Sequence, residues 1–491
     1  MRPTLLGVAL LLPFALGCET TVNPATGRRE VLLMSPEQER EAEEEAEKEI
    51  LSQFGLVHDE ELAAYVQAVG DGLAAHSPRQ DVTYRFKVVE MGVPNAFALP
   101  AGSIYVSRTL LMMLNSEAEL ANVLAHEIAH VAARHAAQRH AHQSTFGVAT
   151  LLGNLASGAD DTKGSRREGT GGAFGIAAYG RNQEREADYI GQDIVVRAGV
   201  DPTAMAQVLR TLQSERRRGE GYNPESSYFL THPTSLERIA ENATRAQIRE
   251  WRPGFAIASG PEEFLAHLEG LPVGRPASEG VVDGNHFLHP ELNFSLRFPP
   301  DWPIENANAY VIARSPRGDA LVMLTLDSQG DDPREAAWAY ARKEGMRLSD
   351  PEPVKIGALD AVRGRAVVET PAGKVDAELT WIAWDGRIYR LLGGRRIGGL
   401  RGSEGFSRAV GRTFRPLSAE ERAQLTELRL RLARAEPGES LDALSRRTGN
   451  EWDLHQTAVA NGIVVGKGLA QGQLVKIAVR EPWRPQPEGS S

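Results

Sequence analysis

The run of residues 120–135, Leu-Ala-Asn-Val-Leu-Ala-His-Glu-Ile-Ala-His-Val-Ala-Ala-Arg-His, constrains the fold of this chain more than any other stretch. Ala, Leu and Val fill it without Pro or Gly, which predicts a helix. Ser116 can cap its start, and Glu119 three residues later completes a capping box. His126 and His130 are four residues apart, so on a helix they lie about 40° apart around the axis, one turn above the other.

This spacing lets both imidazoles reach one metal ion, and Zn²⁺ binds histidine nitrogen at roughly 2.0–2.1 Å. Glu127 directly follows the first histidine, so its carboxylate can lie beside the metal without ligating it. There it can take a proton from a zinc-bound water, whose pKa falls to about 7. The motif therefore predicts a zinc site with Glu127 as general base. The alternative is a chance match within a buried helix.

A catalytic zinc needs three protein ligands and an open fourth position. Residues 180–191, Gly-Arg-Asn-Gln-Glu-Arg-Glu-Ala-Asp-Tyr-Ile-Gly, predict a second helix that is acidic in its first turns. Glu184 and Asp188 share a face of it, whereas Glu186 lies about 200° from Glu184 and points elsewhere. Ala187 is small and allows a close neighbour. We predict Glu184 as third ligand and Asp188 as a catalytic-site carboxylate that orients a ligand histidine or the substrate. The alternative is a solvated acidic helix.

Together, His126-Glu127-x-x-His130 and Glu184-x-x-x-Asp188 resemble the HtpX and CAAX-prenyl-protease family of zinc metallopeptidases. The resemblance is greatest to its periplasmic, BepA-like lipoprotein branch and covers about residues 20–250. It implies a zinc metalloendopeptidase with one Zn²⁺ per chain.

Two further stretches agree with this resemblance. Residues 95–106 resemble the strand that precedes the zinc helix in the family, although Ala101 stands where a glycine is common. Residues 231–238, Thr-His-Pro-Thr-Ser-Leu-Glu-Arg, resemble the family's His-Pro-…-Arg element after the third ligand.

The resemblance also suggests roles for residues outside the two helices. Asn95, Pro100 and Gly102 would belong to an edge strand that pairs with an extended substrate backbone. His232 is a candidate fourth ligand that closes the open position at rest, and its alternative is a turn histidine before proline. Arg238, like His232, is a candidate contact to the oxyanion or the substrate.

Three more histidines follow the motif on the same stretch of chain. His135 lies five residues after His130 and, on a continued helix, falls off the zinc face. We therefore expect His135, His140 and His142 to be surface or packing residues.

The N-terminus has the pattern of a secretory signal, with Arg2, a short apolar run at residues 5–16 and a small residue before Cys18. About twelve apolar residues are too few for a membrane anchor, which needs about twenty. Ala-Leu-Gly-Cys at 15–18 resembles a bacterial lipobox, and Cys18 is the only cysteine of the chain. We expect a periplasmic protein anchored through a lipid on Cys18, with the outer membrane favoured because Glu19 follows. No later stretch offers eighteen consecutive apolar residues, which excludes the integral-membrane branch of the family.

A chain of 491 residues is long enough for two to four domains, and the net charge of −10 argues against a nucleic-acid partner. We predict an α+β multidomain protein with a mainly helical peptidase domain that carries a small edge-strand sheet. The predicted units are a signal peptide (1–18), a tether (19–34), the zinc metallopeptidase domain (35–255), an α+β domain without functional motif (281–416), a LysM-like βααβ module (435–480) and a disordered tail (481–491).

Four regional predictions complete this division. Acidic residues of the predicted helix at 36–53 are expected on a solvated face, and residues 146–179 predict a mobile cover over the cleft. Residues 417–434, dense in Leu, Arg and Glu, are predicted as a helix. Residues 435–480 resemble a family that binds the N-acetylglucosamine backbone of peptidoglycan, and the alternative is a structural cap that binds no glycan.

Two functions follow. The first is an endopeptidase of the bacterial envelope that hydrolyses misfolded or unassembled envelope proteins in quality control. The alternative is a chaperone or assembly factor of the outer membrane or cell wall with a latent zinc site. Glu127 favours the first, because a structural zinc needs no general base.

Overall fold

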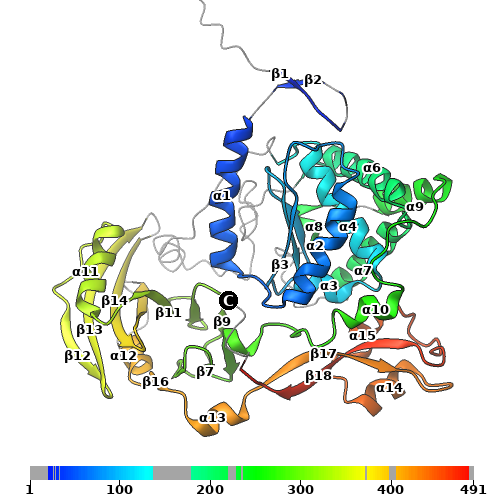
Figure 1. Ribbon diagram of the computed structural model, residues 1–491. Coiled ribbons are helices and arrows are strands. Elements are labelled where there is room, and N and C mark those ends of the chain that lie inside the picture. Colours follow the sequence, from blue (N-terminus) through cyan, green and yellow to red (C-terminus); the bar gives the residue numbers. More distant parts are fainter. Residues whose placement is uncertain are drawn as a thin grey trace, which may run out of the picture.

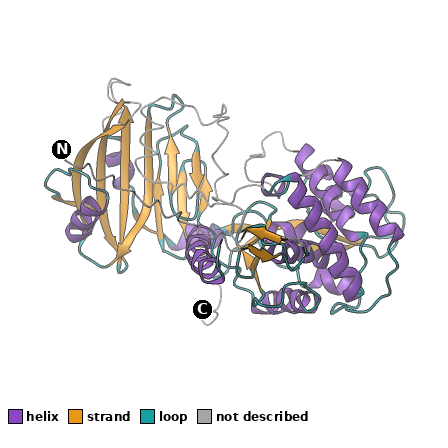
Figure 2. Cartoon of the chain, turned by 90° about the horizontal axis from the view of Figure 1, so that it is seen from above, coloured by secondary structure: helices purple, strands orange, loops and turns teal. Residues whose placement is uncertain are grey.

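The computed structural model describes residues 20–25, 27, 29–31, 34–136, 179–218, 228–233, 236–370, 373–396 and 405–485. A helical body and a sheet body lie side by side, and a C-terminal module lies along the helical body (Figures 1 and 2). Mixed helix and sheet in several bodies agrees with the predicted α+β multidomain class. The predicted signal peptide with Cys18, and the predicted cover apart from Tyr179, lie outside the described residues.

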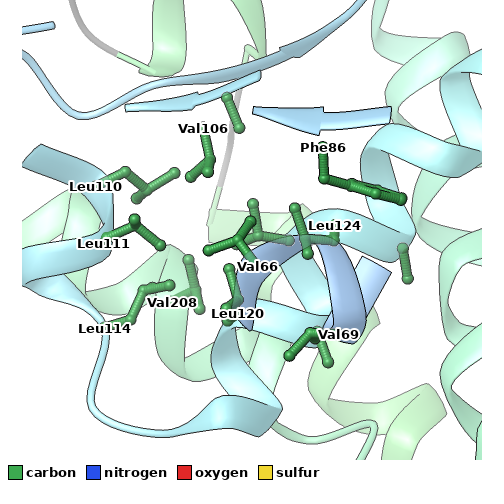
Figure 3. Packing of buried hydrophobic residues seen from close by; sticks show 14 of the residues in the cluster. Val66, Val69, Phe86, Val106, Leu110, Leu111, Leu114, Leu120, Leu124 and Val208 are labelled. Atoms are coloured by element: carbon green, nitrogen blue, oxygen red, sulfur yellow. The ribbon is translucent and has the colours of Figure 1, made fainter. Parts of the chain in front are cut away.

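The helical body surrounds a three-stranded sheet of order β3-β5-β4. Its buried cluster joins Val66, Leu120, Leu124 and Val208 from three helices to Phe86 of the sheet (Figure 3). The elements are α1 (Pro36–Gln53), α2 (Glu60–Ala74), β3 (Arg85–Val89), β4 (Ala96–Ala98), β5 (Ser103–Ser107), α3 (Arg108–Met113), α4 (Glu117–Ala132), α6 (Arg181–Ala198), α7 (Ala204–Arg218), α8 (Tyr228–Thr231), α9 (Leu236–Ile248) and α10 (Pro261–Ala266), preceded by the pair β1 (Thr20–Val22) and β2 (Arg29–Val31).

The expectation that the acids of α1 form a solvated face is wrong for two of them. Glu39 and Glu43 lie one turn apart and are buried. Glu39 pairs with Arg79 at 2.5 Å, and Glu43 accepts hydrogen bonds from the Ala101 amide and the Ser103 hydroxyl, each at 2.7 Å. The loop between β4 and β5 needs such an acceptor, because the amide of Ala101 finds its partner in Glu43 rather than in the sheet.

Residues 95–106 were predicted as one edge strand, but they form a hairpin. Only β4 is at the edge, whereas β5 is central and pairs with both β3 and β4. Pro100 and Gly102 lie in the connecting turn, and Gly102 has a φ of +117° that favours glycine. A Cβ atom on Gly102 would also lie 2.6 Å from the carbonyl oxygen of Thr83.

The sheet body has a seven-stranded antiparallel sheet of order β12-β13-β14-β15-β11-β10-β9, and a four-stranded sheet of order β16-β8-β7-β6. Successive residues of β11 enter different clusters: Leu321 and Met323 pack with α11, and Val322 and Leu324 pack with the smaller sheet. The elements are β6 (Val281–Asp283), β7 (His286–His289), β8 (Phe294–Arg297), β9 (Ile304–Asn306), β10 (Val311–Arg314), β11 (Ala320–Gln329), α11 (Pro333–Lys343), β12 (Glu352–Ile356), β13 (Leu359–Thr370), β14 (Gly373–Trp384), β15 (Arg387–Arg396), α12 (Phe406–Gly411) and β16 (Arg415–Pro416), with a 3₁₀ turn at Ala277–Glu279.

The C-terminal module has the order β17 (Thr426–Arg434), α14 (Leu441–Thr448), α15 (Leu454–Ala460) and β18 (Leu474–Pro482), with β17 antiparallel to β18. The helix predicted for residues 417–434 is wrong beyond α13 (Ala419–Gln424). From Thr426 on, the sequence Thr-Glu-Leu-Arg-Leu-Arg-Leu-Ala-Arg alternates apolar and polar residues. This is the period of a strand, and it outweighs the helix propensity of Leu and Arg.

The C-terminal module packs directly on the helical body. Leu430, Trp452 and Ala478 belong to the same buried cluster as the core around α4. The Nζ of Lys476 is fully buried and donates to the carbonyl oxygens of Met112 at 2.8 Å and Leu114 at 2.6 Å. These carbonyls belong to the end of α3, so the module binds the segment that leads into the helix with the His-Glu-x-x-His motif.

We predict that Lys476 makes stability depend on pH. Burial lowers the pKa of Lys476 to about 7 from 10.5, although the negative charge of Glu119 opposes the shift. Between these values the unfolded chain binds the extra proton, so the free energy of unfolding rises with pH by up to about 1.4 kcal/mol per unit. Urea unfolding at pH 7.5 and 9.0 should show this rise in the wild type and lose most of it in Lys476→Met. Lys467→Met, at an exposed lysine of the same module, is the control. Equal slopes in wild type and Lys476→Met would contradict the assignment.

Candidate metal centre

The site lies between α4 and α6, which pack closely because small residues face each other. A Cβ atom on Gly191 would lie 3.2 Å from the amide nitrogen of His126, and Ala187 is fully buried. The hydroxyl oxygen of Ser116 caps α4 by accepting from the Glu119 amide at 3.2 Å. The carboxylate of Glu119 accepts from the amide of Asn115 rather than completing the predicted box at Ser116.

Four side chains from three segments bring their donor atoms together. One ligand atom from each of His126, His130, Glu184 and His232 lies within 4.8 Å of all the others, and all four residues are buried. The two Nε2 atoms of His126 and His130 are 3.1 Å apart, and Glu184 oxygens lie 3.6 and 3.4 Å from them. Donors bound at about 2.0–2.1 Å to one tetrahedral zinc are about 3.4 Å apart, so this donor set fits a zinc ion.

Two groups behind the donors orient them. Asp188 Oδ1 lies 3.1 Å from His126 Nδ1, which leaves Nε2 of that ring facing the other donors. Arg238 binds Asp188 through Nε at 2.5 Å and Nη2 at 2.8 Å, and its Nη1 pairs with Glu184. Asn242 donates to Asp188 at 2.8 Å. Both buried carboxylates are thus held by one guanidinium.

The charges of the cluster suit a cation. Burial opposes ionisation of Asp188, but Arg238 outweighs it and lowers its pKa to about 2. Burial is likewise outweighed at Glu184, where the charge of His232 and hydrogen bonds from the histidines hold the pKa well below its usual value. Burial keeps the pKa of His130 well below the ordinary range. Burial also acts against a charge on His126, yet hydrogen bonds to Asp188 and Glu184 raise its pKa to about 9, so a binding metal displaces that proton.

The predicted base and latch residues are both next to this cluster. Glu127 is fully buried, and its Oε1 lies 3.5 Å from His232 Nε2. His232 places Nδ1 3.0 Å from Glu184 Oε1 and donates through Nε2 to the Ala96 carbonyl of β4 at 3.1 Å. Asn95 accepts a hydrogen bond from the hydroxyl of Thr231 at 3.1 Å.

Some predicted residues lie apart from the donors. Pro100 and Gly102 are in the turn of the hairpin rather than on its edge, and Cys18 lies outside the described residues. Arg238, a candidate substrate contact, is paired with the two carboxylates, and its Nη2 is 3.4 Å from His126 Nε2.

Sequence reasoning missed several residues that contact the ligands. Tyr179 stacks on His130 with 3.6 Å between ring centroids, and Tyr228 stacks on His232 at 4.4 Å. His135, expected to be a surface or packing residue, is buried outside the donor cluster, and its Nδ1 lies 2.9 Å from His130 Nδ1, a contact that the sequence did not predict. The position of Tyr179, directly before the second helix, was the only sequence signal for it.

Two histidines and a carboxylate on packed helices, with a glutamate beside the first histidine, define the class as a metallopeptidase-type centre. Residues 60–246 match the model of peptidase family M48. These residues therefore form a peptidase family M48 domain, and the predicted metallopeptidase family is confirmed for this part of the chain.

Curated relatives support the same assignment. The beta-barrel assembly-enhancing protease of Yersinia pestis is 30% identical over 261 residues, which are 50% of this chain and 53% of the relative. The mitochondrial metalloendopeptidase OMA1 of Schizosaccharomyces pombe is 32% identical over 234 residues, 47% of this chain and 66% of the relative. The chain thus spans about half to two thirds of the length of these relatives. A crystal structure of LpqN from Mycobacterium tuberculosis is 14% identical and covers 25% of this chain and 81% of its own, with a TM-score of 0.21.

We predict that Arg238 stabilises the metal-free site. Arg238→Gln leaves Glu184 and Asp188 buried without their guanidinium. With a chelator present to keep the site free of metal, this should lower the free energy of unfolding by about 3–5 kcal/mol. Added zinc should restore part of this loss, because it binds the folded state. Arg185→Gln, which breaks the exposed pair with Glu237, should cost at most about 1 kcal/mol. Equal losses in urea unfolding of the two variants would show that the guanidinium does not balance the carboxylates.

Proposed function

We propose that this chain is a zinc-dependent endopeptidase of the bacterial cell envelope. The observation that carries the proposal is the buried donor cluster of His126, His130 and Glu184, with Glu127 beside it, within a family M48 domain. The donor set, the two ionised carboxylates and the adjacent base together suit hydrolysis of a peptide bond.

The residues of the chain divide the work between them. His126, His130 and Glu184 would hold one zinc, which supplies a polarised carbonyl and a water of low pKa. Glu127 accepts the proton of the attacking water and passes it to the leaving amine. Asp188 holds the ring of His126, and Arg238 keeps Asp188 and Glu184 ionised and in place.

The strand β4, at the edge of its sheet, is the proposed binding strand for the substrate backbone. The amide of Ser107 donates to Asn95 and the amide of Leu99 to Ser103, so Phe97 pairs with β5. In an antiparallel pair the groups of the alternate residues, Ala96 and Ala98, point away from the partner strand. A peptide can therefore add as a further strand along β4. In the chain, Asn95 directly precedes this short strand, and Pro100 and Gly102 follow it in the turn.

In this structure His232 covers that edge, which is why we propose it as a latch. Its Nε2–H uses the Ala96 carbonyl, and its Nδ1 faces Glu184 at the position of a fourth ligand. The substrate backbone needs the Ala96 carbonyl, and the attacking water needs the space beside Glu184; His232 contacts both. Activity therefore requires the segment of His232 to move.

Glu127→Gln tests the proposed base. It should bind zinc as the wild type does but cleave casein slower by at least about 10²–10⁴-fold, since an amide cannot accept the proton. Zinc content by atomic absorption and cleavage by gel or fluorescence measure the two properties on one sample. Turnover close to the wild type in this variant would exclude Glu127 as the base.

His232→Ala tests the latch. Freed from the competing ring, the variant should cleave casein faster than the wild type while retaining its zinc, because the other three ligands remain. His455→Ala, at an exposed histidine of the C-terminal module, controls for loss of an imidazole. Reduced cleavage in His232→Ala with full zinc would instead make His232 a contact to the oxyanion or substrate.

The cellular setting is part of the proposal. The names of the bacterial relatives tie them to beta-barrel assembly, which supports misfolded or unassembled envelope proteins as substrates here. The lipobox-like sequence supports a lipid anchor on Cys18 at the outer membrane. Among the described residues there is no helix of the length and apolarity that a membrane crossing needs. Residues 435–480 are proposed to bind peptidoglycan, which sedimentation with purified sacculi tests directly.

The closed site also favours a second candidate function, a chaperone or assembly factor with a latent zinc. His232 is one of the four clustered donors, and Glu127 and the donors are buried. Full rescue of an envelope defect by a Glu127→Gln strain would favour this function over proteolysis.

A further inference from the structure

A chain of three side chains leads from a proposed zinc ligand toward the surface. His130 Nδ1 and His135 Nδ1 are 2.9 Å apart, and His135 Nε2 is 3.0 Å from Glu186 Oε2. Both histidines are fully buried, whereas the side chain of Glu186 is 30% exposed. None of the roles described so far uses His135 or Glu186.

The turn that ends α4 explains how His135 reaches His130. The amide of Arg134 donates to Val131 and the amide of His135 donates to His130, at 3.1 and 3.0 Å. This is the pair of bonds of a Schellman turn, and Arg134 takes the left-handed conformation there with a φ of 55°. The chain reverses at Arg134 and places the ring of His135 behind that of His130. On a continued helix the two rings could not meet.

The hydrogen bonds fix where each proton lies. If His130 gives the lone pair of Nε2 to the metal, its proton must be on Nδ1, because a neutral imidazole has one N–H and one nitrogen with a lone pair. His135 must then accept at Nδ1 and carry its own proton on Nε2. That proton points at a carboxylate oxygen of Glu186, which is an acceptor when ionised. One arrangement of protons therefore satisfies the whole chain, and it leaves a free electron pair on His130 Nε2.

The other ligand histidine is supported differently. His126 contacts a carboxylate directly, Asp188 at 3.1 Å, and the same carboxylate is held by Arg238 and Asn242. For His130, the corresponding carboxylate is that of Glu186. It does not contact His130 directly but is connected to it through the imidazole of His135. Tyr179, stacked on His130, packs against the face of the ring and leaves its edge to His135.

We propose that His135 and Glu186 are positioning residues for the metal: they fix the tautomer and the ring orientation of His130 and increase its basicity through Glu186. The proposal rests on the proposed zinc site. Partners that orient a ligand histidine typically change metal affinity 10–100-fold when removed.

The test measures metal affinity and not proteolysis. Zinc affinity is determined by competition with a chromophoric chelator, and Co²⁺ loaded into the chelator-treated protein reports the ligand field by its visible spectrum. We expect His135→Phe, which keeps ring volume but removes both hydrogen bonds, to bind zinc about 10–100-fold more weakly and to shift the cobalt spectrum. Glu186→Ala should weaken binding in the same way. Glu186→Gln should weaken it less, because its amide oxygen still accepts from His135.

Two controls separate the relay from general effects. Asp193→Asn removes a partly exposed carboxylate on the same helix, paired with Arg249, and should leave zinc affinity unchanged. Arg134→Gly preserves the left-handed turn and should also leave it unchanged. Thermal melts show whether each variant is folded. Because the side chain of Glu186 is partly exposed, its two variants are less prone to misfold than the variant of the buried His135.

The possible outcomes separate the proposed zinc site from the proposed role of His135 and Glu186. If the wild type binds no metal, the proposed zinc site fails. If the wild type binds metal but Glu186→Ala and His135→Phe match it in affinity and cobalt spectrum, the zinc site stands and the relay is overturned. Weaker binding in both, with Glu186→Gln intermediate and both controls unchanged, supports the relay.

Discussion

The structure depends on keeping two carboxylates ionised in the interior of the helical body. Glu184 and Asp188 are almost completely buried, and an isolated carboxylate there would cost several kcal/mol. Arg238 contacts both, and three imidazoles surround Glu184. The cluster therefore balances its buried negative charge with cationic groups and has a donor set that could hold a metal ion.

The rest of the molecule supports this cluster from several directions. On one side, the buried acids of α1 hold the β4–β5 turn, and through it the edge that faces His232. On another, Lys476 of the C-terminal module binds the carbonyls of Met112 and Leu114 at the end of α3. The segment that leads into α4 is thus held by the C-terminal module, and α4 itself ends in the Schellman turn. Large movements of α4 would disturb both, so opening is best attributed to the short segment around His232.

Sequence periodicity predicted the elements that carry the chemistry. Ser116 marks a helix start that the structure confirms, and the helix predicted at residues 36–53 is present as α1. The helical spacing of His126 and His130 brings them together, and Glu184 and Asp188 share a face as predicted. Local pattern suffices for these because both partners of each pair lie on one helix.

Sequence reasoning failed where the outcome depends on a turn or a distant partner. The contact between His135 and His130 was not foreseen, because it depends on the turn after α4, where Arg134 rather than glycine takes the left-handed conformation. Glu39 and Glu43 have the pattern of solvated acids, and only Arg79 and the β4–β5 turn, far along the chain, make them buried. The strand β17 was predicted as part of a helix, because its Leu, Arg and Glu residues also favour helices.

The most direct test of the central claim is an anomalous difference map at the zinc edge from crystals of the protein containing residues 19–491. The account predicts one peak per chain between α4 and α6, about 2.0–2.1 Å from the Nε2 atoms of His126 and His130, with Glu184 as third ligand. A zinc bound elsewhere, or a crystal grown with zinc whose cluster holds none while Arg238 still joins Glu184 and Asp188, would contradict it. In that case the buried charges would be a structural network and not a metal centre.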